Sequence, residues 1–252
     1  MTSTTVFITG ASSGIGESLA RHYASRGYQV GLVARRRNFL DKLAANLQPR
    51  PMTYALDVRD ARALKEAAAD FIARFGVPDI VIANAGVSRG TLTEIADDLN
   101  AFQEIMDINV MGMVNTFHPF IVPMRNAGKG TLVGIASVAG FRGIPGGGAY
   151  SASKSAAIAY CESLRVEMRD SGVSVVTICP GYIRTPMTSV NKFKMPFLID
   201  VDDAVRRFAR AIDAKTSFTV IPWRMGIAAR ILRITPNWLY DRVFSRMPRK
   251  PR

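Results

Sequence analysis

The stretch VFITGASSGIG, residues 6–16, starts with an apolar run and ends in a turn that carries glycines at positions 10, 14 and 16. Glycine loses more backbone freedom on folding than any other residue. Three glycines so close together therefore predict a turn whose backbone lies very close to a neighbouring group. Between a first strand and its helix, such a turn points helix N–H groups at an anion, typically phosphate. The spacing Gly-x-x-x-Gly-x-Gly differs from the commonest dinucleotide fingerprint, so a turn that merely starts a helix stays the alternative.

Short apolar runs alternate with helical patterns along the rest of the chain. The runs predicted as strands are 5–9, 29–34, 53–58, 79–86, 131–137, 173–181 and 217–221. The patterns predicted as helices are 17–27, 38–47, 61–76 and 149–170. Continuous apolar strands are typical of buried parallel sheets, and strand–helix alternation predicts an α/β fold, a doubly wound parallel sheet of about seven strands. We expect one domain over residues 1–221 and a basic amphipathic helical extension over 222–252.

The composition is that of a globular protein, since 48% of the 252 residues are hydrophobic and 21% are charged. Two cysteines without a His/Cys cluster argue against a disulfide scaffold and against structural zinc, and we expect no metal. No basic segment followed by an apolar run opens the chain, and no run approaches the roughly 20 apolar residues that span a bilayer. We therefore expect a cytoplasmic protein.

Further motifs follow the glycine turn in a fixed order. They are NAG at 84–86, Asn109 within IMDINVMG, Ser137 at a strand end, Tyr150 and Lys154 within YSASK, and PGYIRTPM at 180–187. Together they closely resemble the short-chain dehydrogenase/reductase family in its shorter form, over residues 5–221. The resemblance implies a Rossmann fold, a nicotinamide cofactor and an enzyme that interconverts a carbonyl and a secondary alcohol. A cofactor-bound regulator or scaffold on the same fold is the alternative, which the presence of Tyr150 and Lys154 together disfavours.

Tyr150 is the predicted general acid/base of this reaction. The pKa of free tyrosine is about 10, and Lys154, one helical turn away, would favour the tyrosinate and lower that pKa. The resemblance implies that Lys154 also holds the nicotinamide ribose, that Ser137 hydrogen-bonds the substrate oxygen and that Asn109 holds a water behind the lysine. The alternatives are a packed tyrosine beside a solvated lysine, and an asparagine that bonds nearby backbone.

The residues after the second predicted strand indicate which cofactor is used. In LVARRR, Ala34 stands where NAD-preferring relatives carry an acid, and the guanidinium groups of Arg35 and Arg36 suit a phosphate. We therefore expect NADP(H), with a solvated arginine turn as the alternative. The residues expected to hold the cofactor are Gly10, Ser12, Ser13, Gly14, Ile15, Gly16, Arg35, Arg36, Asp57, Val58, Asn84, Ala85, Gly86, Tyr150, Lys154, Pro180, Gly181, Ile183 and Thr185.

The segment 182–200 is expected to close the substrate side of the site, as the resemblance implies. Its apolar residues suit a lipophilic substrate, although they would be equally apolar if they only packed on the body of the protein; they are Met187, Phe193, Met195, Phe197 and Leu198. The resemblance also implies a homodimer or homotetramer.

The formal net charge of +13 is concentrated in residues 222–252, which hold eight basic residues against one acid. Two amphipathic helices are predicted there, over 224–234 and 237–247, with tryptophans at 223 and 238. The expected apolar faces consist of Ile227, Ala228, Ile231, Leu232 and Ile234, and of Leu239, Tyr240, Val243, Phe244 and Met247. Basic amphipathic helices with tryptophan suit peripheral attachment to an anionic membrane surface, here on its cytoplasmic side. The alternative is packing on the protein's own core or a subunit interface; nucleic-acid binding is not expected.

Overall fold

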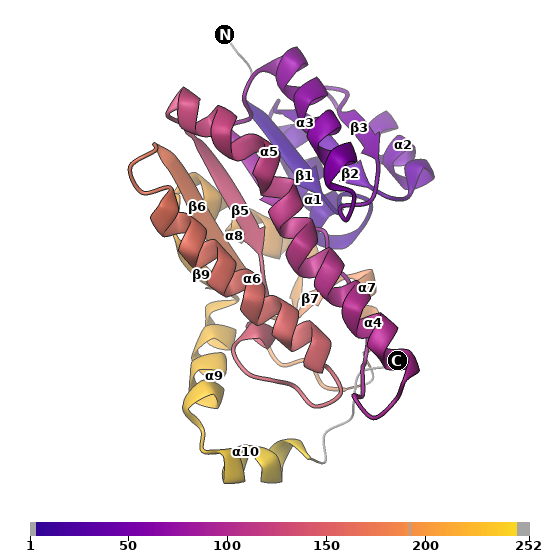
Figure 1. Cartoon of the computed structure of the whole chain (residues 1–252), viewed down its shortest axis with the longest axis vertical. Coiled ribbons are helices and arrows are strands. Elements are labelled where there is room, and N and C mark those ends of the chain that lie inside the picture. The colour runs from indigo at the N-terminus through magenta and orange to yellow at the C-terminus, as the bar shows by residue number, and fades with distance from the viewer. Residues whose placement is uncertain (1–3, 192, 246–252) are drawn as a thin grey trace.

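A seven-stranded, wholly parallel sheet forms the centre of the computed structural model, which describes residues 4–191 and 193–245 (Figure 1). Its strand order is β3-β2-β1-β4-β5-β6-β9. The strands are β1 (Thr5–Thr9), β2 (Gln29–Ala34), β3 (Met52–Ala55), β4 (Ile80–Ala83), β5 (Gly130–Ile135), β6 (Val173–Pro180) and β9 (Phe218–Ile221). The predicted doubly wound sheet is confirmed. Several strands end before the predicted residue because the following residues leave the sheet to line a cavity.

The central strand β1 pairs with β2 on one side and with β4 on the other. The chain runs outward from β1 to β3, then returns to β4 and runs outward in the opposite direction. At such a switch point the connections after neighbouring strands diverge, which leaves a crevice at the carboxyl ends of the strands. The glycine turn after β1 lies at this crevice.

Helices cover both faces of the sheet (Figure 1). One face packs on α1 (Gly14–Ser25), α2 (Arg37–Ala45) and α8 (Val201–Asp213). The other face packs on α3 (Ala61–Phe75), α5 (Gly112–Ala127) and α6 (Gly148–Glu167). Alternation along β1 shows why there are two cores, since Val6 and Ile8 point into the first and Phe7 points into the second.

Two consecutive helical segments precede α5, namely α4 (Asp97–Met106) and the π-helical turn η1 (Asp107–Met111). The sequence patterns give no range for this part of the chain, and α5 itself contains Pro119 and Pro123, which obscure a helical pattern. Short elements complete the carboxyl end of the sheet: η2 (Val138–Gly140), β7 (Ile183–Arg184), α7 (Pro186–Ser189) and β8 (Ile199–Asp200).

The C-terminal part forms α9 (Trp223–Ile234) and α10 (Asn237–Phe244), at the lower end of the molecule in Figure 1. The structure differs in part from the predicted apolar faces, because Leu232 of α9 and Tyr240 and Phe244 of α10 line a cavity whereas the other predicted isoleucines of α9 and Leu239 and Val243 of α10 are exposed. In α9, Met225 and Ala229 are buried, whereas Ile227, Ile231 and Ile234 are exposed. Apolar residues thus occupy two opposite sides of the helix. Met247 and the basic residues Arg246, Arg249, Lys250 and Arg252 lie outside the described residues.

None of the helices within residues 4–191 and 193–245 is long and apolar enough to cross a bilayer. The same part of the chain contains no group of three His, Cys, Asp or Glu side chains that could hold a metal ion.

Candidate active site

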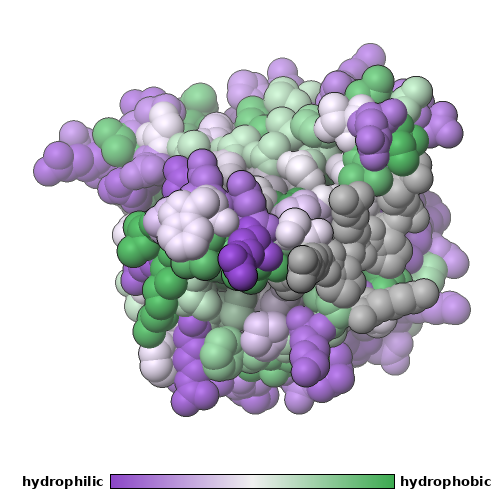
Figure 2. Space-filling model, turned by 90° about the horizontal axis from the view of Figure 1, so that it is seen from below, coloured by the Kyte–Doolittle hydropathy of each residue, from purple (hydrophilic) through white to green (hydrophobic). Residues whose placement is uncertain are grey.

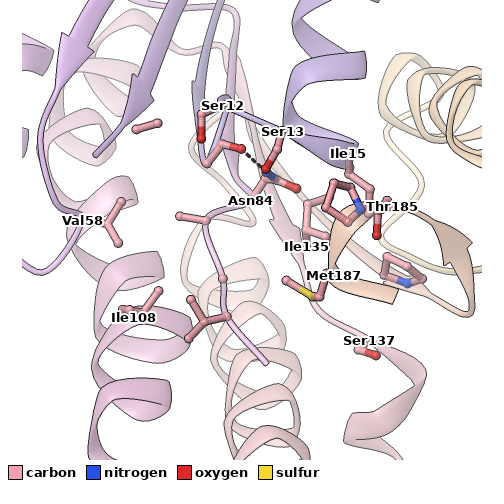
Figure 3. A pocket seen from close by; sticks show the side chains of 18 of the residues that line it. Ser12, Ser13, Ile15, Val58, Asn84, Ile108, Ile135, Ser137, Thr185 and Met187 are labelled. Atoms are coloured by element: carbon pink, nitrogen blue, oxygen red, sulfur yellow. Dashed lines mark hydrogen bonds between the residues drawn. The ribbon is translucent and has the colours of Figure 1, made fainter. Parts of the chain in front are cut away.

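The crevice at the carboxyl ends of β1, β4, β5 and β6 contains a cavity of about 400 Å³. Side chains from the β1–α1 turn, Asn84 and Thr185 surround it, as Figure 3 shows. All of the predicted cofactor-binding residues line this cavity except Gly16, and Ser137 lines it as well. Ala34, on which the expectation of NADP(H) partly rests, also lines it, and so do residues 56, 87, 108, 135, 136 and 186–188, which no sequence motif assigns to the cofactor.

The three glycines of the turn serve different purposes. A Cβ on Gly16 would lie 2.2 Å from the Gly10 carbonyl oxygen and 2.5 Å from the Asn84 amide nitrogen. Gly10 itself has a positive φ of 69°, and a Cβ there would lie 2.7 Å from Ala85 Cα. Gly10 and Gly16 therefore let the turn pack against the end of β4. Gly14, with a φ of 58°, starts α1 at the cavity.

Asn84 connects the end of β4 to the glycine turn. Its side-chain amide donates hydrogen bonds to the backbone oxygens of Thr9 and Gly10, at 3.1 and 3.2 Å. These bonds hold the turn in place, so that the first turn of α1 points into the cavity. The N-cap residue Ser13 makes no side-chain capping bond, which leaves the first N–H groups of the helix to other partners.

Tyr150 lines this cavity together with Ser137 and Lys154. Burial raises the pKa of Tyr150, and a hydrogen bond with Ser137 lowers it in part. Burial also lowers the pKa of Lys154 to about 8. The lysine Nζ lies 5.8 Å from the centre of the Tyr150 ring and donates a 2.9 Å hydrogen bond to the Ile135 carbonyl oxygen. The expected lowering of the Tyr150 pKa is therefore not found here, because burial raises it by more than the hydrogen bond with Ser137 lowers it.

Asn109 lies in the η1 turn and is buried. Its amide nitrogen donates to the Val87 oxygen at 3.0 Å and to Ser153 Oγ at 2.9 Å, while its oxygen accepts from the Val87 N–H at 2.8 Å. Ser153 Oγ in turn donates to the Tyr150 carbonyl oxygen at 2.8 Å. Asn109 does not line the cavity. Its side chain instead ties the segment after β4 to the first turns of α6, which carry the tyrosine and the lysine.

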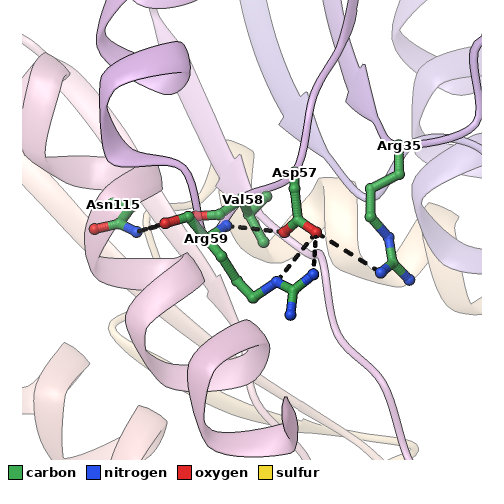
Figure 4. Close-up of polar contacts among 5 residues, drawn as sticks. All are labelled: Arg35, Asp57, Val58, Arg59 and Asn115. Atoms are coloured by element: carbon green, nitrogen blue, oxygen red, sulfur yellow. Dashed lines mark hydrogen bonds and ion pairs between the residues drawn. The ribbon is translucent and has the colours of Figure 1, made fainter.

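A cluster of charges lies at the far end of the cavity, after β2 and β3. Arg59 donates to the Asp57 carboxylate through Nε at 3.1 Å and through its terminal nitrogen at 2.7 Å, and Arg35 lies 3.7 Å from the same carboxylate (Figure 4). The hydrogen bonds from Arg59 lower the pKa of Asp57. Arg59 is not predicted from the sequence, where the only sign of its contact with Asp57 is that it stands two residues later.

Arg36 reaches back to the glycine turn. It donates hydrogen bonds to Ser12 Oγ and Ser13 Oγ, at 2.9 and 3.2 Å, and its guanidinium lies over the Phe39 ring. The arginine and both hydroxyls therefore converge on the start of α1, where a phosphate would be favoured by the helix end as well.

A second cavity, of about 220 Å³, adjoins the first. The two share Ser137, Tyr150, Gly181, Met187 and Thr188. Of the predicted apolar residues in 182–200, Met187 and Phe193 line the second cavity, whereas Met195, Phe197 and Leu198 do not. The C-terminal helices pack on the body of the protein, as the alternative interpretation of this region proposed. No sequence pattern predicts that they also line a cavity, to which they supply Met225, Ala229, Leu232, Tyr240 and Phe244.

The chain belongs to the short-chain dehydrogenase family, whose sequence profile, described as short chain dehydrogenase, matches residues 4–195. An uncharacterized oxidoreductase of Myxococcus xanthus is 39% identical over 249 residues, covering 96% of this chain and 97% of that protein. Family membership supports an enzyme that acts on CH–OH and C=O groups, as the motifs predict.

Solved structures are similar over most of their length. An alcohol dehydrogenase of Thermococcus sibiricus, complexed with 5-hydroxy-NADP, is 28% identical with a TM-score of 0.75, covering 86% of this chain and 95% of that one. A short-chain dehydrogenase/reductase of Burkholderia phymatum, in complex with NAD, has a TM-score of 0.83 at 22% identity, covering 99% and 98% of the two chains, and supports the fold. Nicotinamide cofactors of both kinds thus occur among the neighbours.

Proposed function

We propose that this protein is an NADP(H)-dependent oxidoreductase that interconverts a carbonyl and a secondary alcohol on a lipophilic substrate. The observation that carries the proposal is the position of Tyr150 and Ser137, which line both the cofactor-side and the substrate-side cavity. A substrate oxygen in the second cavity would meet both hydroxyls. The first cavity fits a dinucleotide by its chemistry, since it combines a glycine turn, a helix start, arginines and hydroxyls.

Tyr150 is the proton donor for carbonyl reduction and the base for alcohol oxidation in this proposal. A bound nicotinamide supplies or accepts the hydride. Ser137 hydrogen-bonds the substrate oxygen and shares a hydrogen bond with Tyr150. Lys154 Nζ lies 5.8 Å from the centre of the Tyr150 ring. In its ammonium form Lys154 would favour loss of the phenolic proton when the substrate is an alcohol.

The preference for NADP(H) rests on the residues after β2 and β3. Ala34 supplies no carboxylate to repel a 2′-phosphate. Asp57 accepts hydrogen bonds from Arg59 and lies farther from Arg35. Arg35 is therefore the arginine with the weakest contact to Asp57, and it can bind a phosphate at the lowest cost. Arg36 hydrogen-bonds the glycine turn through Ser12. Guanidinium groups suit a phosphate in this position.

The substrate class rests on the second cavity, which aromatic and aliphatic side chains line. Among its described lining residues, Arg142 is the only charged one. We propose an uncharged, hydrophobic carbonyl or alcohol as substrate. We also propose assembly into a homodimer or homotetramer and peripheral attachment to an anionic membrane surface through residues 223–252.

A screen of hydrophobic ketones and alcohols with NADPH or NADP⁺, with and without lipid, tests the function. We expect consumption of NADPH with at least one apolar ketone, and slower consumption with NADH. Tight NADPH binding without turnover of any member would instead support a regulator on the same fold.

A further inference from the structure

The C-terminal helices α9 and α10 present two chemically different sides. Their inner side, with Met225, Ala229, Leu232, Tyr240 and Phe244, lines the second cavity. Their outer side carries an apolar face that no described residue covers. We call this set the outer face: Trp223, Ile227, Ile231, Ile234, Trp238 and Val243.

The outer face is strongly exposed for side chains of this kind. Ile234 is 81% exposed, Trp238 is 70% exposed and Trp223 is 63% exposed. Positions 223, 227, 231 and 234 follow helical spacing, so these four side chains form one stripe along α9. Figure 2 views the molecule from this end and shows hydrophobic side chains next to hydrophilic ones. An apolar surface of this kind marks an interaction site.

Arginines flank the stripe. Arg224 and Arg230 occupy its two sides at helical spacing, and Arg242 follows on α10. Arg224 also lies over the rings of Trp223 and of the exposed Phe197, so the apolar surface continues onto the segment that precedes β8. Asp241 is the only acid between residues 223 and 245.

Contacts from the loop before α6 hold the two helices in place. Arg142 donates hydrogen bonds to the carbonyl oxygens of Leu232 and Thr235 and to Asn237 Oδ1, and its guanidinium lies 3.9 Å from the centre of the Tyr240 ring. The Tyr240 hydroxyl donates to the Gly143 oxygen at 2.6 Å. These bonds fix the pair against the body of the protein. The outer face is therefore presented by an ordered structure.

We propose that the outer face binds the surface of an anionic bilayer, with its isoleucines and tryptophans in the interface and its arginines at the lipid headgroups. This combination of aromatic, aliphatic and basic side chains is what an interfacial helix requires. A second copy of this chain fits less well, because a symmetric contact would place arginines against arginines with a single acid to offset them.

Binding of the outer face to a bilayer would also give the substrate an origin in the lipid, and this part of the inference rests on the proposed function. The same helices separate lipid from the substrate-side cavity, so a lipophilic carbonyl dissolved in the bilayer has a short path to Tyr150. The binding of the outer face to lipid does not itself depend on catalysis. It can therefore fail or succeed independently of the enzyme activity.

Cosedimentation of the full chain with vesicles tests the proposal. We expect pelleting with phosphatidylcholine vesicles that contain phosphatidylserine, and little pelleting with phosphatidylcholine alone. Arg230→Gln combined with Arg242→Gln should reduce partitioning about tenfold or more. Arg21→Gln with Arg62→Gln is the control, because it removes the same charge from exposed arginines elsewhere. Deletion of residues 223–252 is a poorer test, since it also removes a cavity wall.

Substitutions of the exposed apolar residues test the same proposal in the vesicle assay. The double variant Ile231→Ser with Ile234→Ser should no longer pellet with vesicles but should keep turnover of a water-soluble ketone. The control is Val122→Ser with Val166→Ser, which changes exposed sites on α5 and α6 and should pellet like the wild type. Wild-type protein that stays in the supernatant, or outer-face variants that pellet normally, would overturn the proposal. A smaller oligomer in the outer-face variant, together with no vesicle binding by the wild type, would also overturn it. The outer face would then bind a second copy of the chain.

Discussion

At the scale of single residues, the candidate site contains two ionisable groups that burial shifts toward their neutral forms. Burial raises the pKa of Tyr150, and burial lowers the pKa of Lys154. The hydrogen bond with Ser137 offsets this in part for the tyrosine. The sequence places Tyr150 and Lys154 one helical turn apart, but it cannot show that tertiary packing around α6 buries both groups enough for desolvation to be the largest cause of both pKa shifts.

The depressed pKa of Lys154 predicts a pH-dependent stability. Between about 8 and the ordinary lysine value of 10.5, the unfolded chain binds more protons at this site than the folded protein. The free energy of unfolding contributed by Lys154 therefore rises with pH across this window. Relative to Lys154→Met, the wild type should gain about 2 kcal/mol between pH 8 and pH 10. Urea titrations of both proteins at several pH values measure this, and a constant difference would show that the lysine is not desolvated.

Arg35 is the residue on which cofactor choice should depend most. Arg35→Gln should raise the KM for NADPH about tenfold and leave that for NADH nearly unchanged, because a charge-assisted contact with the 2′-phosphate is lost. Steady-state kinetics with both cofactors measure the effect. The neighbouring Arg37→Gln is the control, since Arg37 does not line the cavity. Equal losses with both cofactors would contradict a role in phosphate recognition.

At the scale of elements, the glycine turn shows what sequence can and cannot predict. Its position after β1 and before α1 follows from the apolar run and the glycines. The different roles of the glycines cannot be predicted from the sequence in the same way. They depend on Asn84, which lies more than sixty residues away and fills the space beside Gly16. Similarly, helical spacing shows which apolar residues of α9 share a side, but only the tertiary structure shows that the side with Met225, Ala229 and Leu232 faces a cavity.

Gly16→Ala should destabilise the protein strongly. The added methyl group would overlap the Gly10 oxygen and the Asn84 amide, both of which belong to fixed structure. We expect a loss of at least about 1–3 kcal/mol in the free energy of unfolding, from overpacking. Gly148→Ala at the start of α6 is the matched control, since nothing lies within 4 Å of a Cβ there. Similar stabilities of the two variants in chemical denaturation would disprove this account of the turn.

Two adjacent residues of α9 separate its inner and outer sides. Leu232→Ala enlarges the substrate-side cavity and should change KM severalfold for bulky apolar ketones, whereas Ile231→Ala removes an exposed side chain and should not. Because both variants remove a comparable aliphatic group from the same helix, differences in helix propensity largely cancel. Kinetics on a series of ketones of increasing size distinguish them, and identical profiles would argue against α9 as a cavity wall.

At the scale of the whole molecule, one architecture explains most of the site. Parallel strands bring residues separated by more than a hundred positions to one edge, so the turn after β1, the NAG segment and Ser137 could be placed together from their strand ends alone. Asn109 and Arg59 could not, because neither stands at a strand end and each hydrogen-bonds a neighbouring side chain instead of lining the cavity. The C-terminal helices close the second cavity, and their role needed the full tertiary arrangement.

The central claim is that the Tyr150 hydroxyl transfers the proton while the rest of the crevice binds the cofactor. Its most direct test is Tyr150→Phe, assayed for turnover of a ketone and, separately, for NADPH affinity by fluorescence titration. We predict a loss of kcat of at least about 100-fold with an NADPH affinity close to that of the wild type. Turnover near the wild-type rate would contradict the claim, because the protein would then be reducing its substrate without this hydroxyl.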